Sequence, residues 1–65
     1  MNRLRRARLI ADKTQLQLMK ETDINFATIS RIENGWFEPT EEQKQKLAKA
    51  LSVDKDWVFP GKGKS

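Results

Sequence analysis

Residues 14–35 read TQLQLMKETDINFATISRIENG, and this stretch predicts two short helices separated by a three-residue break. Thr14 is a suitable N-cap for the first helix. Gln17, three residues later, completes the Thr-x-x-Gln pattern of a capping box. We expect this helix to run to about Thr22.

The second helix of the stretch has its own start and stop signals. The break at residues 23–25 ends in Asn25, which can cap a helix over residues 26–33. Asn34 and Gly35 then form a left-handed stop.

This second helix is expected to have two different faces. Ile29 and Ile32 are three residues apart and should both point inward. The positions off that apolar stripe should point outward; they are Phe26, Ala27, Ser30 and Arg31.

A further helix precedes the stretch, at about residues 2–11. Leu4, Ala7 and Ala11 recur at spacings of three and four, which is typical of one helical face. The asparagine at its start can cap it. Asp12 follows the last periodic residue and tolerates the left-handed backbone that ends a helix.

Two more helices follow the stretch. Thr40 and Gln43 have the spacing of a second capping box, which predicts a helix running to about Leu51. Asp54 can cap a last short turn over residues 55–59. No segment has the pattern of a strand, so the sequence predicts an all-α fold of five helices.

The length of 65 residues allows one small domain. We assign it to residues 1–60, and we expect residues 61–65 to form a disordered basic tail. The predicted core contains the apolar residues that fall on the inward faces: Leu4, Ala7, Leu18, Ile24, Ile29, Ile32, Leu47, Leu51 and Val53.

The composition argues against an enzyme. The chain has no His, Cys or Tyr, so the usual general bases, nucleophiles and zinc ligands are absent, and no metal or cofactor is expected. The longest apolar run is three residues, far short of the roughly 20 that span a bilayer. We therefore expect a cytoplasmic protein without a membrane partner.

The positive charge is concentrated in the first half of the chain. The net charge is +4. Residues 1–31 contain seven basic and three acidic side chains, whereas residues 32–65 contain six of each. This asymmetry indicates a surface that faces a polyanion, although a solvated charged surface is the alternative that charge alone leaves open.

The order of residues along the chain carries a resemblance. It runs through Thr14, Gln15, Leu18, Ile24, Asn25 and residues 28–35, with Leu4 and Arg8 upstream and Pro39, residues 47–51, Val53 and residues 57–59 downstream. This arrangement resembles the lambda repressor and Cro family, often called the Xre family, over about residues 3–59. The resemblance implies a compact five-helix DNA-binding domain with a helix-turn-helix at about residues 15–34.

The resemblance also implies roles for individual residues. Arg8 and Glu33 match a structural ion pair between the first and third helices. The base-reading face would be formed by Phe26, Ala27, Ser30 and Arg31. The predicted phosphate contacts are Gln15, Asn25, Thr28, Asn34, Arg5 and Lys20.

The chain departs from the family pattern at five positions. Asp12 and Asp23 stand where the family usually has Gly, and Met19 stands where it usually has Ala. Lys13 and Lys44 replace leucines, which predicts a smaller core.

We therefore expect a sequence-specific regulator that binds double-stranded DNA, of the phage or mobile-element repressor type, acting by occupying an operator. The alternative is a protein-interaction module of the same fold, an antirepressor, modulator or antitoxin that binds a repressor or toxin. Three apolar residues that are candidates for exposure favour this alternative: Leu9, Leu16 and Phe26.

A weak homodimer, formed mainly on DNA, is expected because one such domain reads only about half a turn of the duplex. Its contact candidates are Trp57, Val58, Phe59 and Pro60. The other interpretation assigns the aromatic residues Trp36, Phe37, Trp57 and Phe59 to the core and its lid.

Several residues keep a second interpretation. Gln15 could serve only to start its helix, Phe26 could belong to the core, and Arg31 could be a solvated surface charge. Three basic residues at the N-terminus are either phosphate contacts or solubilising groups: Arg3, Arg5 and Arg6.

Overall fold

Five helices make up the described part of the chain, residues 2–60 of the computed structural model. They are α1 (Leu4–Ile10), α2 (Gln15–Thr22), α3 (Phe26–Glu33), α4 (Glu41–Leu51) and α5 (Lys55–Val58). No strand occurs within these residues. The predicted all-α fold of five helices is confirmed. The predicted tail, residues 61–65, lies outside the described range.

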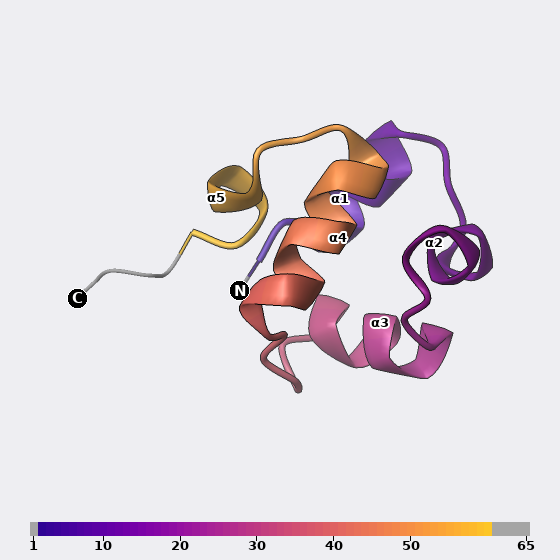
Figure 1. Ribbon diagram of the computed structural model, residues 1–65, viewed down its shortest axis with the longest axis horizontal. Helices are drawn as coiled ribbons and strands as arrows, with labels where there is room; N and C mark the ends of the chain where they lie inside the picture. Colours follow the sequence, from indigo (N-terminus) through magenta and orange to yellow (C-terminus); the bar gives the residue numbers. More distant parts are fainter. Residues whose placement is uncertain (1, 61–65) are drawn as a thin grey trace.

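The helices pack against one another in a chain of contacts. Helices α2 and α5 both pack against α4, and α3 packs against α2 and α1. Figure 1 shows α2 and α3 on one side of α4 and α5 on the opposite side. The two helices of the central sequence stretch therefore lie together at one side of the molecule.

The core forms where these helices meet. Eight of the nine predicted core residues are buried, and Val53 is partly buried against the same cluster. Val58 and Phe59 also belong to the core, which Ala48 joins from α4. The last residues of the described range thus pack back onto the helical bundle.

The loop after α3 corrects one interpretation of the aromatic residues. Trp36 is 79% exposed and Phe37 is also exposed, so neither belongs to the core or a lid. The cause is the turn at Gly35, which has a φ of 77°. Trp36 N–H donates to Arg31 O and Gly35 N–H to Ile32 O, the bonds of a Schellman motif, and this turn carries the chain away from the core.

The N-caps predicted for α2, α3 and α4 are present. Thr14 with Gln17, and Thr40 with Gln43, form complete capping boxes at the starts of α2 and α4. The Asn25 side chain accepts a hydrogen bond from Ala27 N–H at 2.7 Å and caps α3.

Besides Gly35 after α3, left-handed residues other than glycine end three of the helical segments. Asp12 and Asp23 have φ values of 59° and 63°, so the left-handed stop predicted at Asp12 is confirmed and Asp23 adopts the same backbone at a position where the family usually has Gly. Ser52, with a φ of 56°, does the same after α4 and was not predicted.

The first helix differs from expectation at its start. Helix α1 begins at Leu4, and its N-cap position is held by Arg3, which makes no side-chain cap bond. Asn2 accepts from Leu4 N–H at 3.0 Å and donates to Ile32 O at 2.8 Å, so it ties the N-terminal segment to α3.

The last helix also differs from expectation. Asp54 makes no side-chain cap bond, and α5 ends at Val58, one residue early. Lys55 instead donates to Glu41 at 2.7 Å, which fastens α5 to the start of α4 and raises the pKa of Lys55.

The two lysines at leucine positions are held by partners. Lys13 Nζ lies 2.6 Å from Glu21 Oε1 and 2.9 Å from the Ala50 carbonyl oxygen. Lys44 Nζ lies 3.1 Å from Glu38 and 5.9 Å from the Phe59 ring centroid. Both side chains therefore cover the core edge with their stems while their charges stay paired.

Replacing Thr40 with alanine should lower the free energy of unfolding by about 0.5–2 kcal/mol, because Gln43 N–H loses its acceptor at the start of α4. Urea denaturation followed by circular dichroism measures this. Gln45→Ala, an exposed change in the middle of the same helix, is the control. Equal effects of the two substitutions would contradict the role of the cap.

Candidate nucleic-acid interface

Helices α2 and α3 are joined by a short, fixed turn. Thr22 is buried at the end of α2, where its hydroxyl donates to Leu18 O at 2.7 Å and accepts from Ile24 N–H at 3.3 Å. Ile24 is buried and anchors the turn in the core. The angle between the two helices is therefore set by buried contacts on both sides of Asp23.

Helix α3 has the two faces that the sequence predicts. Ile29 and Ile32 are fully buried, whereas Phe26 is 47% exposed and Arg31 is exposed. Ala27 and Ser30 are half-buried. The interpretation of Phe26 as a core residue is wrong, because it sits at the start of α3 and outside the inward stripe.

The Arg31 side chain is free to contact another molecule. It has no hydrogen bond or ion pair with any residue in the range 2–60. A guanidinium carries five N–H donors in a planar fork. Arg31 can thus form two parallel hydrogen bonds with one external acceptor group.

The start of α2 and the end of α3 meet at one side chain. Gln15 is the first residue of α2, and its Nε2 donates to Glu33 Oε1 at 3.1 Å. The Glu33 carboxylate is also bound by Arg8, with Nε to Oε2 at 2.7 Å and Nη2 to Oε1 at 3.3 Å. Arg8 Nη1 donates to Lys13 O as well, at 3.0 Å. The ion pair expected between α1 and α3 is present and well shielded from water.

The other proposed phosphate contacts lie at separate places. Asn25 and Thr28 are at the start of α3, where the Asn25 side-chain oxygen is used for capping. Asn34 follows α3 and donates its side-chain amide back to Ser30 O at 2.9 Å. Arg5 in α1 and Lys20 in α2 are exposed. The fold does not bring all six residues into one cluster.

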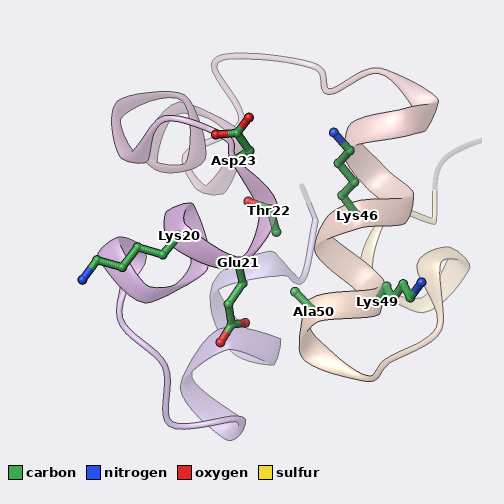
Figure 2. Close-up of a pocket in the computed structure, with 7 residues that line it drawn as sticks. All are labelled: Lys20, Glu21, Thr22, Asp23, Lys46, Lys49 and Ala50. Carbon is green, nitrogen blue, oxygen red and sulfur yellow. The ribbon is translucent and has the colours of Figure 1, made fainter.

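Lys20 borders an open hollow between the end of α2 and α4. Its lining includes Asp23 from the turn and Lys46 and Lys49 from α4. Figure 2 shows the Lys20 and Lys49 side chains pointing away from each other, and neither fills the hollow. The lysines therefore form a dispersed basic surface, with no enclosed site between them.

The segment predicted to form a dimer contact is partly buried. The side chains of Val58 and Phe59 lie in the core, so Trp57 and Pro60 are the accessible residues among the four. Arg3 fixes this segment: its N–H donates to Val58 O at 2.8 Å, and its guanidinium donates to Trp57 O at 2.7 Å and lies 5.2 Å from the indole ring centroid.

Residues 2–60 contain no metal-binding cluster and no membrane-spanning helix. No group of three or more His, Cys, Asp or Glu side chains could hold a metal ion there. None of the helices in this range has the length and apolar character needed to cross a membrane.

Sequence reasoning missed two features of this region. The Gln15–Glu33 hydrogen bond joins residues 18 positions apart, and no local pattern announces it. The exposure of Trp36 was also missed, although Gly35 directly before it signalled the turn that causes it.

Two helices joined by a short turn with a buried anchor residue, the second helix with polar and apolar side chains on its outward face, define the helix-turn-helix class. The family described as helix-turn-helix matches residues 4–58 of the chain. The protein belongs to this family, the Xre or lambda repressor type of helix-turn-helix. A comparison with curated proteins gives no match. The family indicates a DNA-binding transcription regulator and is generally non-enzymatic.

Proposed function

We propose that the protein is a sequence-specific repressor of the phage or mobile-element type that acts by occupying an operator in double-stranded DNA. The observation that carries this proposal is the Arg31 guanidinium on the exposed face of α3, which has no hydrogen-bond or ion-pair partner within residues 2–60. An arginine in this setting suits guanine, whose O6 and N7 accept two hydrogen bonds in the major groove.

The rest of the outward face of α3 supports a simple readout. Phe26 and Ala27 have no side-chain donor, so in the major groove they can recognise the thymine methyl group. Arg31 lies five residues further along the helix, a rise of about 7.5 Å, or roughly two base steps. Each half-site should therefore contain adjacent thymines and, about two base pairs away, one guanine.

The contacts to the DNA backbone would come from other elements. The N-terminus of α2 offers amide N–H groups and the Gln15 side chain to a phosphate, and a helix N-terminus favours an anion. Asn25, Thr28 and Asn34 would contribute near α3. Arg5 and Lys20 would add positive charge without reading sequence.

A weak homodimer on DNA completes the proposal. Trp57 and Pro60 would form the contact, since they are the accessible residues of the segment. Two α3 helices placed about 34–36 Å apart would enter successive major grooves. In this proposal residues 1–60 form the DNA-binding domain, residues 61–65 are a basic tail, and the protein works in the cytoplasm.

A protein-interaction module remains the second candidate. Leu9 and Leu16 are 59% and 52% exposed, which favours an apolar partner surface near the junction of α1 and α2. In that case a repressor or a toxin would be the target.

Fluorescence anisotropy with a labelled random-sequence duplex separates the two candidates. DNA binding that is measurable at low salt and weakens steeply as salt rises supports the regulator, because bound Lys and Arg displace counterions. No binding at low salt by the folded protein would favour the protein-interaction module.

Arg5→Ala and Lys20→Ala should each weaken binding to all DNA sequences alike. Each should also reduce the slope of log K against log salt by about one unit, since one phosphate contact is lost. Lys49→Ala is the matched control, because Lys49 is an exposed lysine on α4, outside the helix-turn-helix. A slope that all three substitutions lower equally would contradict the proposed backbone contacts.

A further inference from the structure

The Glu33 carboxylate makes two contacts at once: an ion pair with Arg8 of α1 and a hydrogen bond with Gln15 at the start of α2. Its side chain is only 4% exposed. Oε2 accepts from Arg8 Nε at 2.7 Å, while Oε1 accepts from both Arg8 Nη2 at 3.3 Å and Gln15 Nε2 at 3.1 Å. One buried anion therefore holds an arginine from α1 and a glutamine from α2.

This arrangement leaves part of the Gln15 amide available. A glutamine amide has two N–H donors and one oxygen acceptor, and Glu33 uses one of the donors. The remaining N–H stays fixed in direction because the carboxylate that anchors the amide is itself held by two bonds from Arg8. A donor fixed in this way binds an incoming acceptor without first losing rotational freedom.

The charges at this site are also matched. An isolated carboxylate beside Gln15 would repel a DNA phosphate, and the repulsion would be strong because Glu33 is shielded from water. The paired Arg8 guanidinium cancels that negative charge. Gln15 can then bind a DNA phosphate although its amide is hydrogen-bonded to a carboxylate.

From this geometry we propose that Glu33 is a positioning residue for DNA binding: it orients the Gln15 amide so that its second N–H donates to a backbone phosphate. The inference rests on the proposed function and adds that the Arg8–Glu33 pair contributes to DNA binding through Gln15. Glu33 itself does not touch the DNA.

A double-mutant cycle between Gln15→Ala and Glu33→Gln tests the link. Glu33→Gln keeps the size of the side chain but replaces one acceptor oxygen with an NH2 group. Arg8 retains the remaining oxygen, and the NH2 group that replaces Oε1 can no longer accept from Gln15 Nε2, so this N–H loses its fixed direction. DNA affinity is measured by anisotropy at a temperature at which urea denaturation shows every variant to be folded.

We expect Gln15→Ala to weaken DNA binding by about tenfold in the unaltered protein and by less than about threefold in the Glu33→Gln background. Arg31→Ala is the matched control, because Arg31 has no contact with Glu33; its effect should be the same in both backgrounds. Equal effects of Gln15→Ala in the two backgrounds would overturn the inference, since a purely structural Glu33 gives independent losses.

A second measurement is made on the unaltered protein, and a variant serves only to assign the signals. The two side-chain amide protons of Gln15 are followed by 15N NMR during titration with DNA, with Gln15→Ala used to assign them. The chemical shift of the proton that is bonded to Glu33 should stay unchanged. The chemical shift of the other proton should change when it donates to the phosphate. Movement of both protons, or of neither, would overturn the inference even if DNA binds. Absence of any DNA binding would overturn the proposed function as well.

Discussion

Replacing Arg8 with methionine is expected to lower the free energy of unfolding by about 3–5 kcal/mol, a large share of the stability of a domain of this size. The substitution removes both guanidinium bonds to Glu33 and leaves a carboxylate of 4% exposure without its cation. It also removes the donor to Lys13 O in the turn before α2. The loss should appear directly in the midpoint of urea denaturation.

Two further variants separate charge from packing. Lys46→Met breaks an exposed ion pair with Glu42 and should cost less than about 1 kcal/mol. Changing Glu33 to leucine together with Arg8→Met removes both charges at once and should recover part of the lost stability. An Arg8→Met protein as stable as the Lys46→Met protein would contradict the structural role of the pair.

Replacing Arg31 with alanine is expected to reduce the affinity for the specific DNA site by about 1–3 kcal/mol. The Arg31 side chain makes no hydrogen bond or ion pair within residues 2–60, so the change should leave the stability of the fold nearly unaltered. The loss should be confined to one base pair, because the guanidinium would read a single guanine in each half-site.

The measurement compares the specific site with a site in which that guanine is exchanged. The unaltered protein should discriminate between the two duplexes, and the Arg31→Ala protein should bind both with similar affinity. Arg5→Ala is the reference for a backbone contact and should weaken both duplexes alike. If Arg31→Ala also lowers binding to specific and random DNA equally, Arg31 contacts only the backbone and the proposed readout is wrong.

The starts of α2 and α4 were predictable from the sequence, because capping is local. Thr14 and Thr40 each meet their glutamine partner three residues later, and the complete capping boxes form as the spacing indicates. The left-handed stop at Ser52 could not be predicted in the same way. Serine has no special tolerance for that backbone, and the bonds from Ser52 and Val53 to carbonyls in α4 accompany it.

Composition could not predict which aromatic side chains are buried and which are exposed. Trp36 and Phe59 are equally apolar candidates for a core, yet Trp36 is exposed and Phe59 is buried. What separates them is the geometry of the chain: Gly35 turns Trp36 outward, whereas α5 folds back and brings Phe59 onto the other helices. Such differences depend on contacts that are distant in the sequence.

The candidate interface was predictable to a different degree at each residue. The outward position of Phe26 and Arg31 follows from helical periodicity, because Ile29 and Ile32 fix the inward stripe. The Arg8–Glu33 pair came from the resemblance to a family and from no local rule. The bond between Gln15 and Glu33 depends on how α2 meets α3, so it required the structure.

Selection of bound duplexes from a random DNA pool asks whether the protein reads sequence at all. We expect an enriched site with two related halves, each containing adjacent thymines and one guanine, and loss of the preference at that guanine when Arg31→Ala is used. Failure of the folded protein to enrich any sequence at low salt would rule out sequence-specific DNA binding and would favour a protein partner.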